Sequence, residues 1–125
     1  MIFGVGIDLV EIGRIENVLK KWEEKFLCRI YSAEEIRYCN GQARPAVHFA
    51  ARFAVKEAFL KAIGLGMGGG VRFRDIETTH DEMGKPMLKL AGGASSFLEA
   101  REIRAAHLTI SHTSAHATAV VILER

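Results

Sequence analysis

The apolar positions of this chain follow two different periods, and the period changes along the sequence. Residues 2–9 alternate β-branched or aromatic residues with glycine, which is typical of a strand. Residues 11–22 place apolar side chains three or four positions apart, and this spacing predicts a helix. A capping box from Ser32 to Glu35 predicts a short second helix, which should end near Cys39.

A long helix is predicted from about Pro45 to Ile63, because proline favours the first helical turn and Gly64 provides a C-terminal cap. The later segments predict two strands around a turn, a helix, and a terminal hairpin. In chain order these elements span residues 71–79, 86–90, 94–104, 107–113 and 116–123. The resulting order, β-α-α-α-β-β-α-β-β, indicates an α+β fold.

The long helix carries charge although most of its residues are apolar. At about 100° per residue, Arg52 and Lys56 should lie close together, with Glu57 and Lys61 about a quarter turn or more further round. We interpret the four as one charged edge of a buried helix. A carboxylate between two lysines is suited to hold a divalent cation while the lysines meet phosphate oxygens. The alternative is an exposed Glu57–Lys61 ion pair, which would stabilise the helix by only about 0.2–0.5 kcal/mol.

The first strand offers a partner for that helix. Alternation places Gly4, Gly6 and Asp8 on one face, where the glycines leave room for a helix backbone to approach. The alanines suited to this approach are Ala50, Ala54 and Ala58. Asp8 would then lie at the end of the strand, near Glu57, and a magnesium ion would relieve the repulsion between the two carboxylates. Alternatively, Asp8 caps the following helix.

A glycine-rich stretch and the polar tip of the terminal hairpin give weaker signals. The glycine-rich residues 64–70 follow a helix and do not end in Gly-Lys-Ser/Thr, so they are not a Walker loop. They are either a helix cap with a loop or a site of close approach to a ligand. The terminal hairpin holds His112, Thr113 and His116, without a third zinc ligand or an acid that would complete a triad. Phosphate contact and ordinary strand-end polarity both remain open there.

Composition narrows the function classes. A length of 125 residues is typical of a single domain, here residues 1–125, and a net charge of +2 is too weak to indicate nucleic-acid binding. The N-terminal segment has no basic region and reaches Asp8 early, so we expect neither a signal peptide nor a membrane span. Cys28 and Cys39 fit no metal or redox spacing and are expected to be reduced thiols of a cytoplasmic protein.

Three segments taken together carry a family resemblance: GIDLVEI at residues 6–12, ARFAVKEAFLKAIGLG at 51–66 and ISHTSAHATAVVI at 110–122. They resemble the holo-acyl-carrier-protein synthases, a branch of the 4'-phosphopantetheinyl transferases, and the likeness runs from Met1 to the C-terminus. The resemblance implies an antiparallel sheet packed against a long central helix. It also implies transfer of 4'-phosphopantetheine from coenzyme A to a serine of apo-acyl carrier protein, with release of adenosine 3',5'-bisphosphate, in support of fatty acid biosynthesis.

The same resemblance implies roles for individual residues. Asp8 and Glu57 would bind magnesium and, with Lys61, form the catalytic group. The base that accepts the serine proton is either Glu57 or a magnesium-bound water, and both remain open. The expected coenzyme A contacts are Arg52, Lys61, Gly64, His112 and Thr113, and the expected carrier-docking residues are Arg14, Lys21 and Lys25. His116 stands where an aromatic residue is common in the family, so no role is assigned to it.

The resemblance also concerns assembly. Related transferases about twice as long consist of two similar halves with the site between them, so a chain of this length implies a homotrimer with sites at subunit interfaces. The apolar residues 120–123 of the terminal hairpin could supply the contact. Two other functions remain possible: a non-catalytic module that binds an acidic partner through the basic first helix, and a metal-dependent nucleotide hydrolase that uses the same carboxylates.

Overall fold

The computed structural model describes residues 1–65 and 69–125. Its helices and strands follow the predicted order, with one added 3-10 turn. They are β1 (Ile2–Glu11), α1 (Ile12–Ile30), α2 (Ala33–Asn40), α3 (Pro45–Ile63), the 3-10 turn (Phe73–Asp75), β2 (Ile76–His80), β3 (Pro86–Leu90), α4 (Gly92–Ala100), β4 (Ala105–His112) and β5 (His116–Glu124). The predicted α+β class and the long central helix are therefore confirmed.

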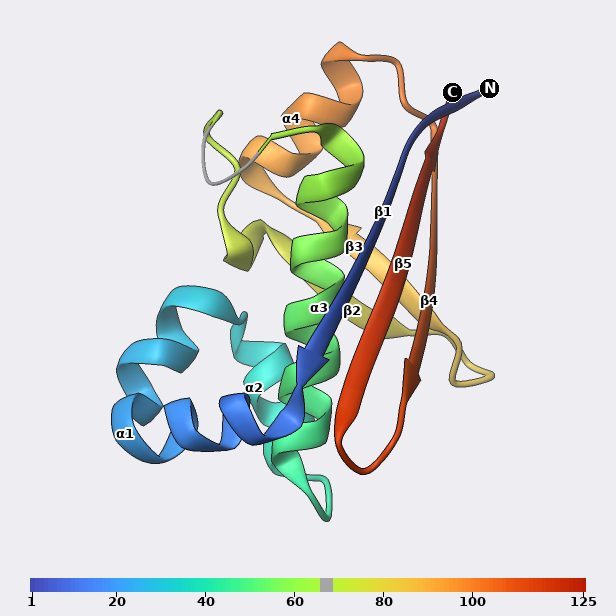
Figure 1. Cartoon of the computed structure of the whole chain (residues 1–125). Coiled ribbons are helices and arrows are strands. Elements are labelled where there is room, and N and C mark those ends of the chain that lie inside the picture. The colour runs from blue at the N-terminus through green and yellow to red at the C-terminus, as the bar shows by residue number, and fades with distance from the viewer. Residues whose placement is uncertain (66–68) are drawn as a thin grey trace.

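The strands form two antiparallel sheets, one with the order β1-β5-β4 and one made of β2 and β3. Figure 1 shows α3 running beside the three-stranded sheet, with α1 and α2 on its other side. The two ends of the chain lie together, where the Arg125 backbone N–H donates to the Met1 carbonyl at 2.8 Å. The sheet on one side and the helices α1 and α2 on the other enclose α3. None of the helices in the described ranges is long and apolar enough to cross a membrane.

The contact between β1 and α3 is backbone to backbone. A Cβ atom on Gly4 would lie 1.9 Å from the Ala62 carbonyl oxygen, and one on Gly6 would lie 1.8 Å from the Ala58 carbonyl oxygen. Any side chain at either glycine would therefore push the strand off the helix. This confirms the predicted close approach and the predicted part of Ala58 in it. The second helix residue is Ala62, and not Ala50 or Ala54 as predicted.

A buried ion pair joins α2, α3 and β2. Lys56 Nζ lies 2.7 Å from Glu35 Oε1, and both side chains are fully buried. Lys56 also donates to the carbonyl oxygens of Phe73 and Ile76, while Glu35 Oε2 accepts the Thr78 backbone N–H. The interpretation of Lys56 as a phosphate-facing residue on a charged helix edge is therefore wrong, because internal acceptors already surround its ammonium group.

Several element boundaries differ from the predicted ones. The helix α1 continues to Ile30 rather than ending near residue 22, because Phe26, Leu27 and Ile30 extend its apolar face past a polar run. Residues 71–75 are not part of a strand. The Asp75 backbone N–H donates to the Arg72 carbonyl and forms the 3-10 turn, while the Arg72 backbone N–H donates to the Asp75 carboxylate and caps it.

The predicted helix over residues 94–104 instead spans Gly92–Ala100. Glu102 adopts φ 57°, and the Ile103 N–H donates to the Leu98 carbonyl at 2.9 Å. This is a Schellman-type stop, which ordinarily uses glycine at the position of positive φ.

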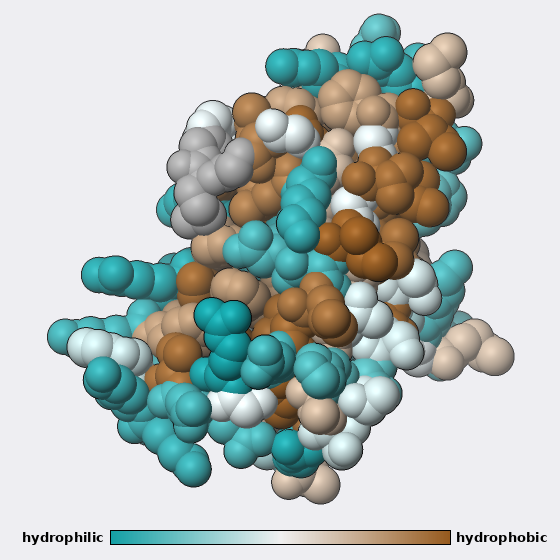
Figure 2. All heavy atoms as spheres, viewed as in Figure 1, coloured by the Kyte–Doolittle hydropathy of each residue, from teal (hydrophilic) through white to brown (hydrophobic). Residues whose placement is uncertain are grey.

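The outer face of the three-stranded sheet is apolar and open. Val5, Ile7 and Leu9 are each more than half exposed, and Figure 2 shows brown, apolar atoms along the course of β1. On β5, Val120 and Ile122 share this face and are only partly covered. The prediction that residues 120–123 all offer an external contact needs correction, because Val121 and Leu123 are fully buried in the core of this chain.

Candidate active site

A cleft between β1, α1 and α3 brings together the residues predicted to be catalytic. Lys61 Nζ lies 3.1 Å from Asp8 Oδ1 and also donates to the Ile7 carbonyl at 2.9 Å. Asp8 and Glu57 both line a cleft of about 300 Å³, which extends to Arg14. Asp8 lies within β1 rather than at its end, and it does not cap α1, whose N-cap is Glu11. Lys61 bonds to Asp8 and does not form the alternative surface pair with Glu57.

The two carboxylates of the cleft influence each other. Partial burial raises the pKa of Glu57, the negative charge of Asp8 raises it further, and Lys61 offsets part of the shift. Two carboxylates that repel across an open cleft have the donor chemistry of a hard divalent cation site, since magnesium is held by one or two carboxylates and completes its shell with water and phosphate oxygens. Within the described residues, no group of three or more His, Cys, Asp or Glu side chains forms a metal cluster. A magnesium site here would therefore depend on Asp8, Glu57 and the substrate.

The predicted phosphate-contacting residues Arg52 and His112 lie elsewhere. On α3, Arg52 is rotated about 140° from Glu57 and about 180° from Lys61. Its guanidinium lies over the Tyr38 ring of α2, at 4.2 Å from the ring centroid. The His112 ring, at the end of β4, approaches His48 of α3 with 6.2 Å between ring centroids. The structure therefore brings Asp8, Glu57 and Lys61 together on one side of α3, and Arg52 and His112 on another.

The remaining predicted coenzyme contacts have structural roles of their own. Gly64 is the left-handed cap of α3, with φ 77°, and a Cβ atom there would meet no neighbour within 4 Å. Thr113 Oγ1 accepts the backbone N–H groups of Ala115 and His116 and so closes the β4–β5 turn. The predicted ligand role of the glycine-rich stretch falls partly on residues 66–68, which lie outside the described residues. The coenzyme roles of Gly64 and Thr113 stay predictions.

Comparison with known proteins decides the family. The sequence model of the 4'-phosphopantetheinyl transferase superfamily matches residues 4–121. The chain belongs to this superfamily. It is 50% identical to a holo-[acyl-carrier-protein] synthase of Syntrophus aciditrophicus, over 99% of this chain and 97% of the relative. It is 47% identical to the synthase of Koribacter versatilis, over 99% of both chains. The resemblance found in the sequence is thereby confirmed.

Solved structures of the superfamily share the whole fold. The holo-[acyl-carrier-protein] synthase of Neisseria meningitidis is 38% identical, with a TM-score of 0.93 over 100% of both chains. The synthase of Helicobacter pylori, determined in complex with coenzyme A, is 33% identical with a TM-score of 0.85, over 96% of this chain and 99% of that one. The arrangement of β1, α3 and the terminal hairpin described above is therefore that of the superfamily.

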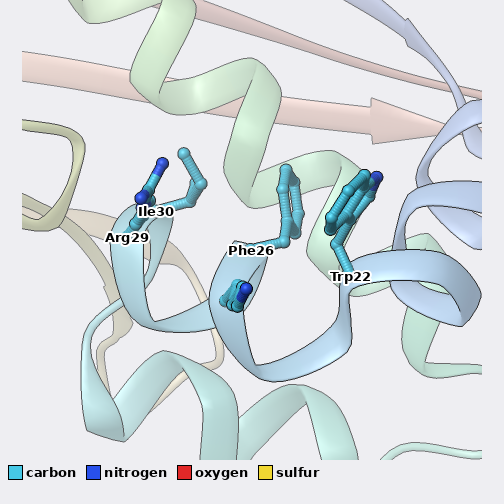
Figure 3. A pocket seen from close by; sticks show the side chains of 5 residues that line it. Trp22, Phe26, Arg29 and Ile30 are labelled. Atoms are coloured by element: carbon cyan, nitrogen blue, oxygen red, sulfur yellow. The ribbon is translucent and has the colours of Figure 1, made fainter.

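The basic residues predicted to dock a carrier protein lie on the exposed side of α1. Arg14, Lys21 and Lys25 are all exposed. Arg14 lines the catalytic cleft, and Lys25 lines a neighbouring pocket of about 510 Å³ together with Trp22 and Arg29. Figure 3 shows the labelled apolar side chains of this pocket projecting from α1 toward α3. Phe26 lines both the pocket and the cleft, so the two form one continuous surface.

Two groups of residues were not predicted from the sequence. Glu35 was interpreted only as part of a capping box, which it also forms with Ser32, and its ion pair with Lys56 depends on a residue 21 positions away. The second group is a polar cluster of Tyr38, His48 and His80 around Arg52. One available signal was that His48 stands one helical turn before Arg52 and therefore shares its face of α3.

Proposed function

We propose that this chain transfers the 4'-phosphopantetheine group of coenzyme A to a serine hydroxyl of an apo-acyl carrier protein. The products are holo-acyl carrier protein and adenosine 3',5'-bisphosphate. The observation that carries the proposal is that Asp8 and Glu57 line one cleft, which reaches Arg14 of α1, while Lys61 donates to Asp8. The whole-length similarity to holo-[acyl-carrier-protein] synthases supports it.

The residues of the cleft account for the transfer. The serine oxygen forms a bond to the β-phosphorus of the coenzyme, and the bond from that phosphorus to the bridging pyrophosphate oxygen breaks. Lys61 places a positive charge and donor hydrogens beside Asp8, where they can stabilise charge on the phosphoryl oxygens. We propose Glu57 as the group of this chain that accepts the serine proton, and the rise of its pKa by burial and by Asp8 supports that role.

Asp8 and Glu57 are the residues that would hold a magnesium ion. Bound there, magnesium would neutralise negative charge on the pyrophosphate and so favour departure of the adenosine bisphosphate. The repulsion between the two carboxylates is the feature of this chain that favours the metal.

Assembly into a homotrimer with shared sites is part of the proposal. Two observations support an intersubunit site. The catalytic cleft and the Arg52–His112 group lie on different sides of α3, and the outer sheet face exposes Val5, Ile7 and Leu9. A second copy that packs on this apolar face would cover it and could offer its own Arg52 group to the cleft of the first.

A cytoplasmic location and a role in fatty acid biosynthesis complete the proposal. The free thiols of Cys28 and Cys39 are consistent with a reducing compartment. The basic side chains along α1 suit an acidic carrier protein, since complementary charge accelerates association.

The proposal is tested by incubating the chain with coenzyme A, magnesium and an apo-acyl carrier protein, and following the mass of the carrier. A gain equal to one phosphopantetheine group, with a matching yield of adenosine 3',5'-bisphosphate, is expected. Chelation of the metal should stop the reaction, and its restoration should restart it. Release of adenosine 3',5'-bisphosphate without a carrier would favour the hydrolase instead, and carrier binding without any mass gain would favour the non-catalytic module.

Light scattering tests the assembly. A trimer is expected, and Ile7→Lys on the outer sheet face should disperse it and lower activity together. An active monomer at the assay concentration would refute the intersubunit site.

A further inference from the structure

Arg52 is a buried cation that has no paired anion among the residues the structure describes. Arg52 is only 3% exposed, and its Nε has no hydrogen-bond partner within the described part of the chain. None of the ion pairs among those residues involves it. Burying a charge is costly unless the charge is paired. The Tyr38 ring covers one face of the guanidinium, so an anion would approach in the plane of its N–H groups.

Histidines from three different elements surround Arg52 and Tyr38. His48 belongs to α3 and His80 ends β2, and their rings lie 5.8 Å and 4.8 Å from that of Tyr38. His112 ends β4 and lies next to His48. His80 and His112 are exposed, so the cluster is open to solvent on their side. The backbone thus gathers three ionisable rings around one unpaired arginine.

The charges around these rings are mostly positive. Burial lowers the pKa of His48, and Arg52, His112 and His80 lower it further. Burial and Arg52 also lower the pKa of His80, which Asp81 alone raises. The Asp81 carboxylate accepts the backbone N–H groups of its own turn, at Met83 and Lys85, and does not pair with the cluster. An anionic ligand would therefore remove an existing electrostatic strain.

We propose that His48 and His80 are specificity residues of this chain, which act with Arg52 to bind a phosphate monoester. The proposal rests on the proposed function. Coenzyme A carries two phosphate groups: a pyrophosphate, which must lie at Asp8, Glu57 and Lys61 to react, and a 3'-phosphate monoester on the ribose. Only the monoester is free to occupy a second cationic group, whether in the same chain or in a neighbouring copy.

Proton uptake follows from this assignment. In the free protein both histidines are mainly neutral near pH 7.5, because their pKa values lie below the ordinary value of about 6.5. A dianion beside them favours the protonated rings and raises both pKa values. Binding should therefore take up protons, and the affinity for a monoester should rise as the pH falls from about 8 to about 6.5.

Calorimetric titration with coenzyme A and with dephospho-coenzyme A, which lacks the monoester, tests the inference. The wild-type chain should prefer coenzyme A by at least about tenfold at pH 6.5, roughly 1.4 kcal/mol, and by less at pH 8. His48→Gln and His80→Gln should each reduce this preference at pH 6.5 and flatten its pH dependence. His107→Gln is the control, because that ring pairs with Glu124 away from the cluster. Wild-type titrations in two buffers of different ionisation enthalpy measure the proton uptake without any variant.

An unchanged preference in both histidine variants, or wild-type binding without proton uptake, would overturn the inference. A different result would refute the proposed function. If the wild-type chain modifies the carrier but discrimination does not depend on the histidines, only the inference is lost. If it modifies no carrier, yet binds adenosine 3',5'-bisphosphate over adenosine 5'-monophosphate through His48 and His80, the cluster stands and the transferase does not.

Discussion

Replacing Glu57 with glutamine should weaken the reaction and stabilise the fold. The carboxylate lies half-buried in the cleft, and burial together with the charge of Asp8 raises its pKa. When the pKa of a carboxyl group is higher in the folded than in the unfolded chain, the folded protein loses stability as the pH rises from the unfolded-state pKa through the folded-state pKa. At neutral pH the ionised group is therefore a cost to the folded state, which Glu57→Gln removes without changing the side-chain shape.

The two effects differ in size. Solvent screens a half-exposed carboxylate, and Lys61 offsets part of the repulsion, so the gain in unfolding free energy should be only about 0.2–0.5 kcal/mol, as for other like-charge pairs near a surface. The rate should fall at least about a hundredfold, roughly 2.7 kcal/mol of barrier, because a charged ligand of the cation and a possible base is lost. Asp8→Asn should act through the same ion, so the double variant should lose far less than the product of the two single losses.

Urea denaturation at pH 7.5 and pH 4, with and without magnesium, measures the stability, and steady-state transfer at several magnesium concentrations measures the rate. Without metal, the variant should be the more stable protein at pH 7.5, and the difference should shrink toward pH 4, because the raised pKa of Glu57 favours its protonated form there. With metal, the wild-type chain should gain more stability than the variant. Glu82→Gln, on an exposed turn, is the matched control. Normal turnover of folded Glu57→Gln at low magnesium would refute the catalytic reading of the cleft.

Lys56→Met should lower the free energy of unfolding by about 3–5 kcal/mol, because it leaves a buried carboxylate uncompensated, whereas exposed Lys85→Met should change it little; urea denaturation compares them. Gly6→Ala should lower the free energy of unfolding by about 1–3 kcal/mol or more, since its Cβ would lie 1.8 Å from the Ala58 carbonyl oxygen. Gly13→Ala, whose Cβ would meet no neighbour within 4 Å, should leave the stability unchanged or raise it; thermal melting compares the two variants. Arg14→Glu should raise the Michaelis constant for the carrier protein much more than that for coenzyme A, and added salt should narrow this difference in steady-state assays.

The parts of the fold that follow from local rules were predictable. Pro45 and Gly64 set the ends of α3, and alternation placed Gly4 and Gly6 against it, because these signals depend only on backbone geometry. The C-terminal end of α4 was not predictable, because Glu102 adopts a positive φ without being glycine. The full length of α1 was not predicted because a polar run at residues 20–25 interrupts its apolar spacing. In the structure this run is exposed to solvent, so the helix continues through it to Ile30.

The candidate site shows a similar division. Asp8, Glu57 and Lys61 were predicted together, and the structure places Asp8 and Glu57 in one cleft with Lys61 bonded to Asp8. Lys56 was grouped with them because a helical wheel gives the direction of a side chain but not the element that covers it. Its burial depends on Glu35, a partner from α2 that no periodicity connects to α3.

The helix α3 is mostly buried, and the direction of each charged side chain explains why the helix tolerates it. Lys56 turns toward α2 and β2 and is neutralised inside the fold by Glu35. Glu57 and Lys61 turn toward β1, which Gly4 and Gly6 allow to pack closely on α3. There Asp8 forms an ion pair with Lys61 and shares the cleft with Glu57. Arg52 turns toward the histidine cluster, and its buried Nε finds no hydrogen-bond partner in the described ranges 1–65 and 69–125. Because α3 itself separates these last two groups, packing of the helix holds each group in place. Under the proposed function, their cooperation on one coenzyme would therefore need a second copy of the chain. Activity should therefore depend on assembly even though each chain folds around its own complete core.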